Sequence, residues 1–389
     1  MRVTRRPLRF VATATGLAAL LATATVGCSV TEKITTGLKV KHAFEKLGEQ
    51  PSASVMVSVD GTAGDAEKFL RASGARDETA TRRAAKLLTR GELTFAVGSD
   101  KEETPLRELS RSERLRLAAA VNFGGKDVLA AKSVEEKLYL RVNLPSLVAQ
   151  LGGSEHDRAR ARRVVELADE LPRTLGSAKD ALKGKWVEAD PESFDDFARA
   201  SREISEGGPT PDRARARTHD DAGTREARET QETSERVSRA TAAGRALNGQ
   251  SEREFLDGLE KTLGRHASFK KAGERGGAEH ITVSMPARQA ASGLSDALEA
   301  LGARLDPAGV PDRTVEADLE IRRGQLTGLT ADLGQFLGGK DAKDVKLPLR
   351  MDFGGGDAVS VEAPDGAREL KPQDLLAAMM YGALGTRDY

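Results

Sequence analysis

The sequence has few of the residues that cross-link or rigidify small proteins. It contains one cysteine, Cys28, so a disulfide bond within the chain is excluded and the fold depends on its apolar core. Only 4% of the residues are aromatic, whereas 31% are charged. This composition indicates that part of the chain is solvated rather than packed.

Residue patterns that mark catalytic and metal sites are also missing. The sequence has no Gly-x-Ser-x-Gly turn, phosphate-binding loop or Ser-x-x-Lys motif in a suitable context. Two aspartates flank the glycine run at 354–356, and their charge would repel a phosphate. The histidines are scattered without an i, i+4 pair, so we expect no catalytic residue, no metal site and no cofactor. The five histidines are His42, His156, His219, His266 and His280.

The charge balance argues against a nucleic-acid partner. Lys plus Arg and Asp plus Glu both number 60, but the four charged residues before Cys28 are all arginines. Without them the chain keeps 56 basic residues, 60 minus 4, against 60 acidic ones. A mildly acidic protein has no general electrostatic attraction to nucleic acid.

The N-terminal segment has the organisation of a signal peptide, which we place at 1–27. Four arginines precede an apolar run at 10–26, and the small residue Gly27 follows it. This run has 17 residues, fewer than the roughly 20 that span a bilayer comfortably, and threonines dilute it. It is therefore a poor permanent membrane helix.

The residues Thr25-Val26-Gly27-Cys28 resemble a bacterial lipobox, although Thr25 stands where Leu is usual. The resemblance implies a diacylglyceryl anchor at Cys28 and a location on the outer face of the cell membrane. Export would follow the Sec route or, because 4–8 weakly resembles a twin-arginine signal, the twin-arginine route. The alternative is an ordinary signal peptide followed by an incidental cysteine.

Alternation of apolar and polar residues predicts short strands along much of the remaining chain. Turns too short for crossover helices predict antiparallel pairing between 92 and 142. Pro348 indicates that the last strand lies at a sheet edge or contains a bulge. The predicted strands are 53–60, 92–97, 115–123, 128–132, 137–142, 185–189, 267–271, 280–285, 314–321, 325–333 and 345–353.

Apolar residues at helical spacing predict the remaining elements. The segment 30–38 is short and polar, which is typical of a tether. Strand-to-helix corners recur at 137–148 and 185–194, and Trp186 at the second is more simply a core anchor than a ligand platform. The predicted helices are one or two turns at 40–47, 66–88 divided near Gly74, the segments after Pro145 and Pro191, and 251–263, 286–301 and 372–384.

Residues 205–250 contain almost no large apolar side chains and many charges of both signs. Such a segment cannot bury a core, so we expect a disordered insertion. The predicted organisation is a signal peptide at 1–27, a lipidated N-terminus and tether at 28–49, two halves of one sheet domain at 50–204 and 251–389, and the insertion between them. The second half ends in the C-terminal helix.

About ten or eleven short strands with a few amphipathic helices predict an α+β fold, with a large antiparallel sheet carrying helices on one face. The lipobox and the segments KLYLRVNLPSL, GKWVEADPESF, HITVSMPAR and VKLPLRMDF resemble actinobacterial envelope lipoproteins that share the fold of the periplasmic lipoprotein carrier and the mycobacterial lipid-binding lipoproteins. The resemblance covers roughly residues 50–365 without the insertion. It implies a curved half-barrel sheet, with helices on the concave face around an apolar cavity for acyl chains.

The resemblance implies that inward-facing side chains line that cavity, although a packed core would use the same residue types. The implied function is a non-catalytic, membrane-anchored lipoprotein that binds or carries a lipid or lipoglycan. The alternative is an envelope scaffold or sensor partner with a filled core, whose segment 205–250 recruits a protein. The cavity candidates are Val55, Val57, Phe95, Val97, Leu138, Leu140, Leu147, Val283, Leu294, Leu298, Leu319, Leu329 and Met351.

Overall fold

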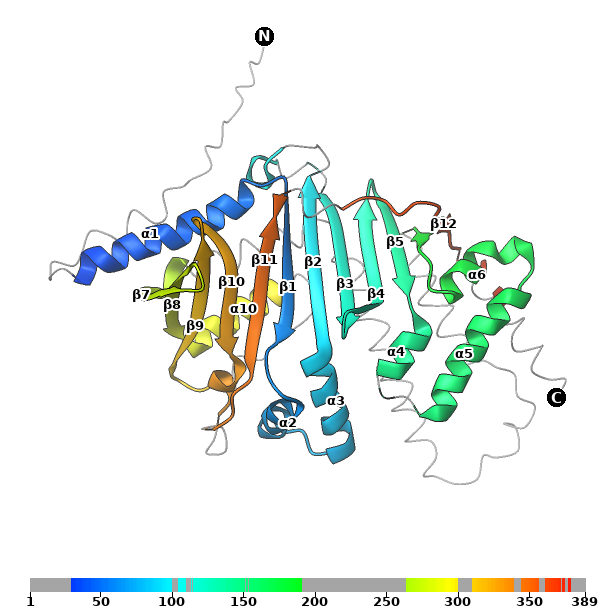
Figure 1. Ribbon diagram of the computed structural model, residues 1–389, viewed down its shortest axis with the longest axis horizontal. Helices are drawn as coiled ribbons and strands as arrows, with labels where there is room; N and C mark the ends of the chain where they lie inside the picture. The colour runs from blue at the N-terminus through cyan, green and yellow to red at the C-terminus, as the bar shows by residue number, and fades with distance from the viewer. Residues whose placement is uncertain are drawn as a thin grey trace, which may run out of the picture.

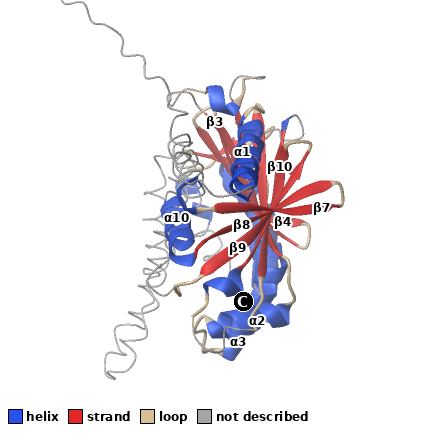
Figure 2. Ribbon diagram, turned by 90° about the vertical axis from the view of Figure 1, so that its left-hand side faces the viewer, coloured by secondary structure: helices blue, strands red, loops and turns tan. Residues whose placement is uncertain are grey.

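The computed structural model describes residues 29–99, 104–109, 113, 115–150, 152, 154–190, 264–299, 310–338, 344–356, 361–371, 373–374 and 377–378. Within these ranges the chain forms a single twelve-stranded sheet with helices packed against it (Figure 1). The sheet is open at both ends, and its strands fan out when it is viewed from the side (Figure 2). The predicted α+β class and large antiparallel sheet are confirmed.

All eleven predicted strands are present, and a short twelfth strand was not predicted. The strands are β1 (Ser52–Val59), β2 (Gly91–Ser99), β3 (Leu115–Phe123), β4 (Lys126–Val134), β5 (Lys137–Val142), β6 (Val187–Ala189), β7 (Ser268–Arg275), β8 (Ala278–Pro286), β9 (Thr314–Arg322), β10 (Gln325–Asp332), β11 (Pro348–Gly355) and β12 (Arg368–Glu369).

The helices partly match the prediction, since α5 and α6 were not expected. The helices are α1 (Ser29–Gly48), α2 (Ala63–Ala72), α3 (Glu78–Arg90), α4 (Leu144–Gln150), α5 (Glu155–Glu170), α6 (Gly176–Leu182) and α10 (Ala287–Glu299), with 3-10 turns η2 (Leu106–Glu108), η3 (Arg173–Leu175) and η7 (Leu333–Phe336). The signal peptide, the insertion, the helices expected after Pro191 and at 251–263, and most of the helix expected at 372–384 lie outside the described residues.

The strand order is β12-β6-β5-β4-β3-β2-β1-β11-β10-β9-β8-β7. The first strand, β1, therefore lies in the middle of the sheet, paired with β2 on one side and with β11 on the other. Every pairing is antiparallel except the short parallel contact of β12 with β6. Two sets of neighbouring strands, one from each end of the chain, thus meet at the β1–β11 pair.

Four hairpins use two-residue turns whose residues all have positive φ, the conformation that matches the twist of the flanking strands. Three of the turns contain glycine: Gly124-Gly125, Gly276-Gly277 and Arg323-Gly324. The fourth, Glu135-Glu136, has no glycine and φ values of 53° and 67°. These turns fix the register of the β3–β4, β4–β5, β7–β8 and β9–β10 pairs.

Helix α1 corrects the predicted tether. Residues 30–38 form the first part of this helix, which continues to Gly48. Val40 and Ala43 are buried in a cluster with Ile281 and Leu319, and Phe44 packs against the same cluster. Contact with the sheet therefore stabilises a helix that the polar sequence of its first half did not predict.

The prediction that Pro348 marks a sheet edge or a bulge is wrong, because β11 lies between β1 and β10 and pairs with both without a register shift. The proline is instead the first residue of its strand, a position where its missing N–H leaves no gap in the ladder. Its carbonyl oxygen accepts a hydrogen bond of 2.9 Å from the Asp60 N–H. The end of β1 is therefore still tied to the start of β11.

The C-terminal segment from Val361 crosses the sheet and ends in β12. Val361 is buried with Val134 and Tyr139, and Trp186 packs against this cluster as a core anchor. The Lys132 Nζ donates a hydrogen bond of 3.0 Å to the carbonyl oxygen of Glu362 and lies 5.5 Å from the centre of the Trp186 ring. We call residues 361–371 the C-terminal strap.

None of the described helices is both long enough and apolar enough to cross a lipid bilayer.

Candidate functional site

The sheet register places all ten cavity candidates on strands on the same face. Val55, for example, is directly opposite Phe95 on β2 and Phe353 on β11, and paired residues point to the same side of a sheet. We call this side the apolar face. Its candidates are Val55, Val57, Phe95, Val97, Leu138, Leu140, Val283, Leu319, Leu329 and Met351.

Some of these candidates are ordinary core. Leu319 is fully buried, and Leu138 and Val283 are 2% and 3% exposed. Leu329 packs against the cluster that α1 covers, and Leu140 packs against a second cluster beneath α6. These five side chains already have protein neighbours, so they are poor candidates for contact with a ligand.

The other five candidates on strands form what we call the central strip: Val55, Val57, Phe95, Val97 and Met351. They come from the adjacent strands β1, β2 and β11, and all five are half-buried. None of them belongs to a buried cluster or packs against one within the described part of the chain. The central strip therefore separates the packed core under α1 from the packed core under α6.

The three helical candidates belong to α4 and α10. Leu147 is half-buried on α4, which follows β5 directly. Leu294 and Leu298 belong to α10, which contacts β8, β9 and η7, but their side chains lie outside the described residues. The structure thus brings five of the strand candidates together in one strip.

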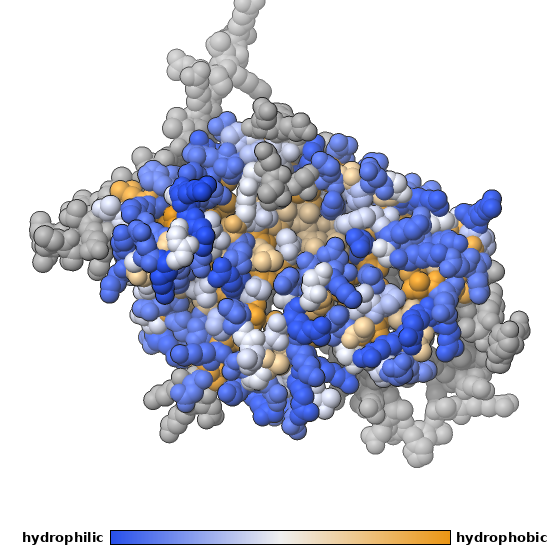
Figure 3. Space-filling model, in the orientation of Figure 1, coloured by the Kyte–Doolittle hydropathy of each residue, from blue (hydrophilic) through white to orange (hydrophobic). Residues whose placement is uncertain are grey.

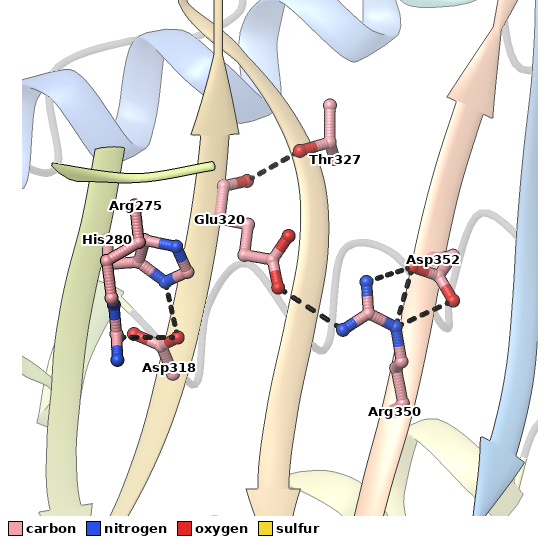
Figure 4. Close-up of polar contacts among 7 residues, drawn as sticks. All are labelled: Arg275, His280, Asp318, Glu320, Thr327, Arg350 and Asp352. Carbon is pink, nitrogen blue, oxygen red and sulfur yellow. Dashed lines mark hydrogen bonds and ion pairs between the residues drawn. The ribbon is translucent and has the colours of Figure 1, made fainter. Parts of the chain in front are cut away.

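The opposite face of the sheet carries a group of charged side chains, shown in Figure 4. We call Arg275, His280, Asp318, Glu320, Arg350 and Asp352 the polar cluster. The strands in Figure 4 follow the same order from left to right as in Figure 1, so both figures show the sheet from the side of the polar cluster. Figure 3 shows the whole of this side, where hydrophilic residues predominate and hydrophobic ones form small separate areas.

Backbone pairing holds the centre of the polar cluster in place. His280 on β8 is directly opposite Glu320 on β9, and Asp318 lies two residues before Glu320 on the same face. The His280 Nδ1 and the Asp318 Oδ2 are hydrogen-bonded at 2.6 Å. Because His280 is only 8% exposed, this imidazole is largely shielded from water.

Two arginines balance the carboxylates of the polar cluster. The Arg350 Nε donates hydrogen bonds of 2.9 and 3.0 Å to Asp352, and its NH1 donates one of 3.2 Å to Glu320. The hydrogen bond with Asp352 is the main reason that the pKa of Arg350 is raised. The Arg275 NH2 lies 3.6 Å from the Asp318 Oδ2. Three carboxylates therefore face two guanidinium groups.

No short sequence motif marks this cluster. His280 and Asp318 are 38 residues apart and meet only through strand pairing. One signal was present: residues 314–321 carry Glu316, Asp318 and Glu320 at every second position, on the side opposite the apolar residues. A row of acids on one face of a predicted strand would have pointed to a charged surface.

No family model matches this sequence, and neither does any curated protein. Among solved structures, the chain is similar to the Mycobacterium tuberculosis lipoprotein LppX, with 8% identity and a TM-score of 0.30, covering 85% of this chain and 99% of that one. It is similar to LprF from Mycobacterium bovis with 9% identity and a TM-score of 0.34, covering 86% and 98%.

Proposed function

We propose that this protein is a non-catalytic lipoprotein, anchored through Cys28 on the outer face of the cell membrane, that binds a hydrophobic ligand on the central strip. The observation that carries the proposal is the state of Val55, Val57, Phe95, Val97 and Met351. They are half-buried and apolar, and they lie between two packed clusters without belonging to either. Apolar side chains that fill no packed cluster favour contact with an apolar ligand.

The chemistry of the central strip favours an acyl chain over a polar molecule. Its five side chains carry no hydrogen-bonding group apart from the weakly accepting sulfur of Met351. Each methylene of a ligand that leaves water contributes about 0.8 kcal/mol, so a long acyl chain gains affinity without any polar contact. The proposed cargo is therefore a lipid or lipoglycan held by its hydrocarbon part.

A lipid anchor suits this activity. A single acyl chain gives only marginal membrane binding, whereas two chains hold a protein stably at the surface. A diacylglyceryl group on Cys28 would keep α1 and the sheet beside the membrane from which a lipid ligand is drawn. Changing Cys28 to Ser should release the exported protein from the membrane fraction, and continued membrane attachment would contradict this part of the proposal.

Ligand binding is tested by native mass spectrometry of the mature chain from residue 29, purified from a bacterium without detergent. The expected result is an extra mass of lipid size that disappears on denaturation and is recovered in an organic extract. A clean apo mass, together with no uptake of a fluorescent fatty acid, would contradict lipid binding. That outcome would favour the alternative, a scaffold with a filled core that binds a protein.

A matched pair of variants locates the ligand. Val57→Gln places a polar group in the central strip, whereas Met56→Gln makes a similar change on the next residue, which faces the other side of β1 and is 36% exposed. We expect Val57→Gln to weaken uptake of the fluorescent fatty acid at least tenfold and Met56→Gln to leave it unchanged. Circular dichroism of both variants tests whether they are folded. Equal uptake by both folded variants would place the ligand elsewhere.

A further inference from the structure

We infer that His280, Asp318 and Glu320 form a binding site for one zinc ion on the polar face of the sheet. The site lies on the side opposite the central strip and does not depend on lipid binding. Each of the three side chains offers one possible ligand atom, and these three atoms lie within 4.8 Å of one another. They come from two adjacent strands, so the backbone register fixes their spacing (Figure 4).

The donor set suits zinc. Zinc is commonly held by imidazole nitrogen at about 2.0–2.1 Å and carboxylate oxygen at about 2.0–2.2 Å, with three protein ligands where a position is left open. The Asp318 side chain is 33% exposed, so water can reach the remaining position. The charges of Asp318 and Glu320 would together neutralise the two charges of the ion.

His280 differs from the other histidines that the structure describes. His42, His156 and His266 are all exposed, whereas His280 is 8% exposed. The His280 Nδ1 and Asp318 Oδ2 are 2.6 Å apart, and two ligands of one tetrahedral zinc ion lie about 3.4 Å apart. A small side-chain rotation that opens this contact would admit the ion between them.

The neighbouring arginines can give way to the ion. Arg350 would lose one hydrogen bond of 3.2 Å to Glu320 but keep its contacts of 2.7 to 3.0 Å with Asp352. The Arg275 side chain is 67% exposed and its contact with Asp318 is 3.6 Å, so it can turn into solvent. Neither arginine would be left buried without a carboxylate partner.

Isothermal titration of the metal-free mature protein with zinc chloride tests the inference. We expect one ion per chain and a rise in melting temperature on zinc addition. His280→Ala and the nearly isosteric Glu320→Gln should each weaken zinc binding at least tenfold, and His42→Ala, which changes an exposed histidine beside Glu45, should leave it unchanged. Glu320→Gln keeps the test valid if His280→Ala fails to fold.

Several results would overturn the site. The absence of binding heat, unchanged affinity in both variants, or loss of binding in His42→Ala would each contradict it. A calcium titration provides the chemical control, since calcium prefers six to eight oxygen ligands. Calcium binding as tight as zinc binding would show a general acidic surface instead. Failure of zinc binding leaves the fatty-acid result unaffected, so the two proposals fail separately.

Discussion

Arg350 and Glu320 form an ion pair across a strand that lies between them. Arg350 is on β11 and Glu320 on β9, and their side chains meet above β10 with the NH1 and Oε1 atoms 3.2 Å apart. Gly328 on β10 makes the crossing possible. A Cβ atom added there would lie 3.2 Å from the Glu320 Cδ and 3.3 Å from its Oε2. The absence of a side chain at one residue therefore joins three strands on the polar face.

This geometry predicts that Gly328→Val destabilises the protein by about 1–3 kcal/mol, because the new side chain displaces the Glu320 carboxylate. In a Glu320→Ala background the same change should cost much less, since the displaced group is gone. Urea unfolding of the wild type, both single variants and the double variant measures the coupling. The same cost in both backgrounds would show that Gly328 serves another purpose.

A second prediction concerns the link between α1 and the sheet. The Lys39 Nζ donates hydrogen bonds of 2.8 and 3.1 Å to the Glu279 carboxylate on β8. This contact is the main cause that lowers the pKa of Glu279 below its usual 4.5. Because the folded pKa lies below the unfolded one, the stabilisation is present above the unfolded pKa and is lost as the pH falls through the folded pKa.

Lys39→Ala should therefore reduce the free energy of unfolding at pH 7 by at most about 1 kcal/mol, since the Lys39 side chain is 48% exposed. The difference from the wild type should shrink on acidification below the usual Glu279 pKa. Urea unfolding at pH 7 and at a pH below the usual Glu279 pKa measures this difference in stability. Lys41→Ala is the control, because Lys41 pairs with Glu45 inside α1. A cost independent of pH would assign Lys39 a packing role.

A third prediction uses the only tryptophan in the chain as a reporter for the C-terminal strap. Val361 is 4% exposed in the cluster against which Trp186 packs. Val361→Asp should destabilise the protein by more than about 2 kcal/mol, because it buries a charge without a partner. It should also shift the Trp186 emission to longer wavelength.

Glu362→Ala provides the control for the strap. Lys132 bonds the backbone carbonyl of Glu362 and not its side chain, so this variant should keep both stability and emission. If Val361→Asp left the Trp186 emission unchanged, the strap would not depend on this contact.

A fourth prediction concerns the Glu135-Glu136 turn. Glutamate at a φ of 67° is strained, and the second position of such a turn favours glycine. Glu136→Gly should raise the free energy of unfolding by about 1 kcal/mol. Gly277→Glu is the reciprocal change at the equivalent position of the β7–β8 turn, where an added Cβ would meet nothing within 4 Å. Gly277→Glu should lower the free energy of unfolding by a similar amount. No gain from Glu136→Gly, or no loss from Gly277→Glu, would contradict this account of the turn.

Alternation and turn residues predicted most strands well, because the side-chain period of a strand and the turns that end it are local. The bounds of β3 and β5 match the prediction to the residue. Helix α1 was underestimated, since its stability comes from contacts with β7 and β10 that its sequence does not display. Pro348 was misplaced because proline at the first residue of a central strand is also permitted.

The site was predictable only in part. Alternation correctly placed Val57 and Leu319 on the same face, but a core side chain and a half-buried one use the same residue types. Only the positions of the helices decide whether such a residue is part of the packed core or stays half-buried. The polar cluster depends on the β8–β9 pairing, which joins His280 to Glu320 across 40 residues, and no local pattern specifies that partner.

The β1–β11 pair has a consequence for the making of the protein. Seven residue pairs join a strand that begins at Ser52 to one that ends at Gly355, so most of the chain is synthesised before β1 meets its second neighbour. Until then the open backbone edge of β1 can recruit other strands. Contacts this distant also slow folding, which prolongs the exposure. The newborn chain therefore carries an exposed strand edge, a site for aggregation, until nearly its full length is available.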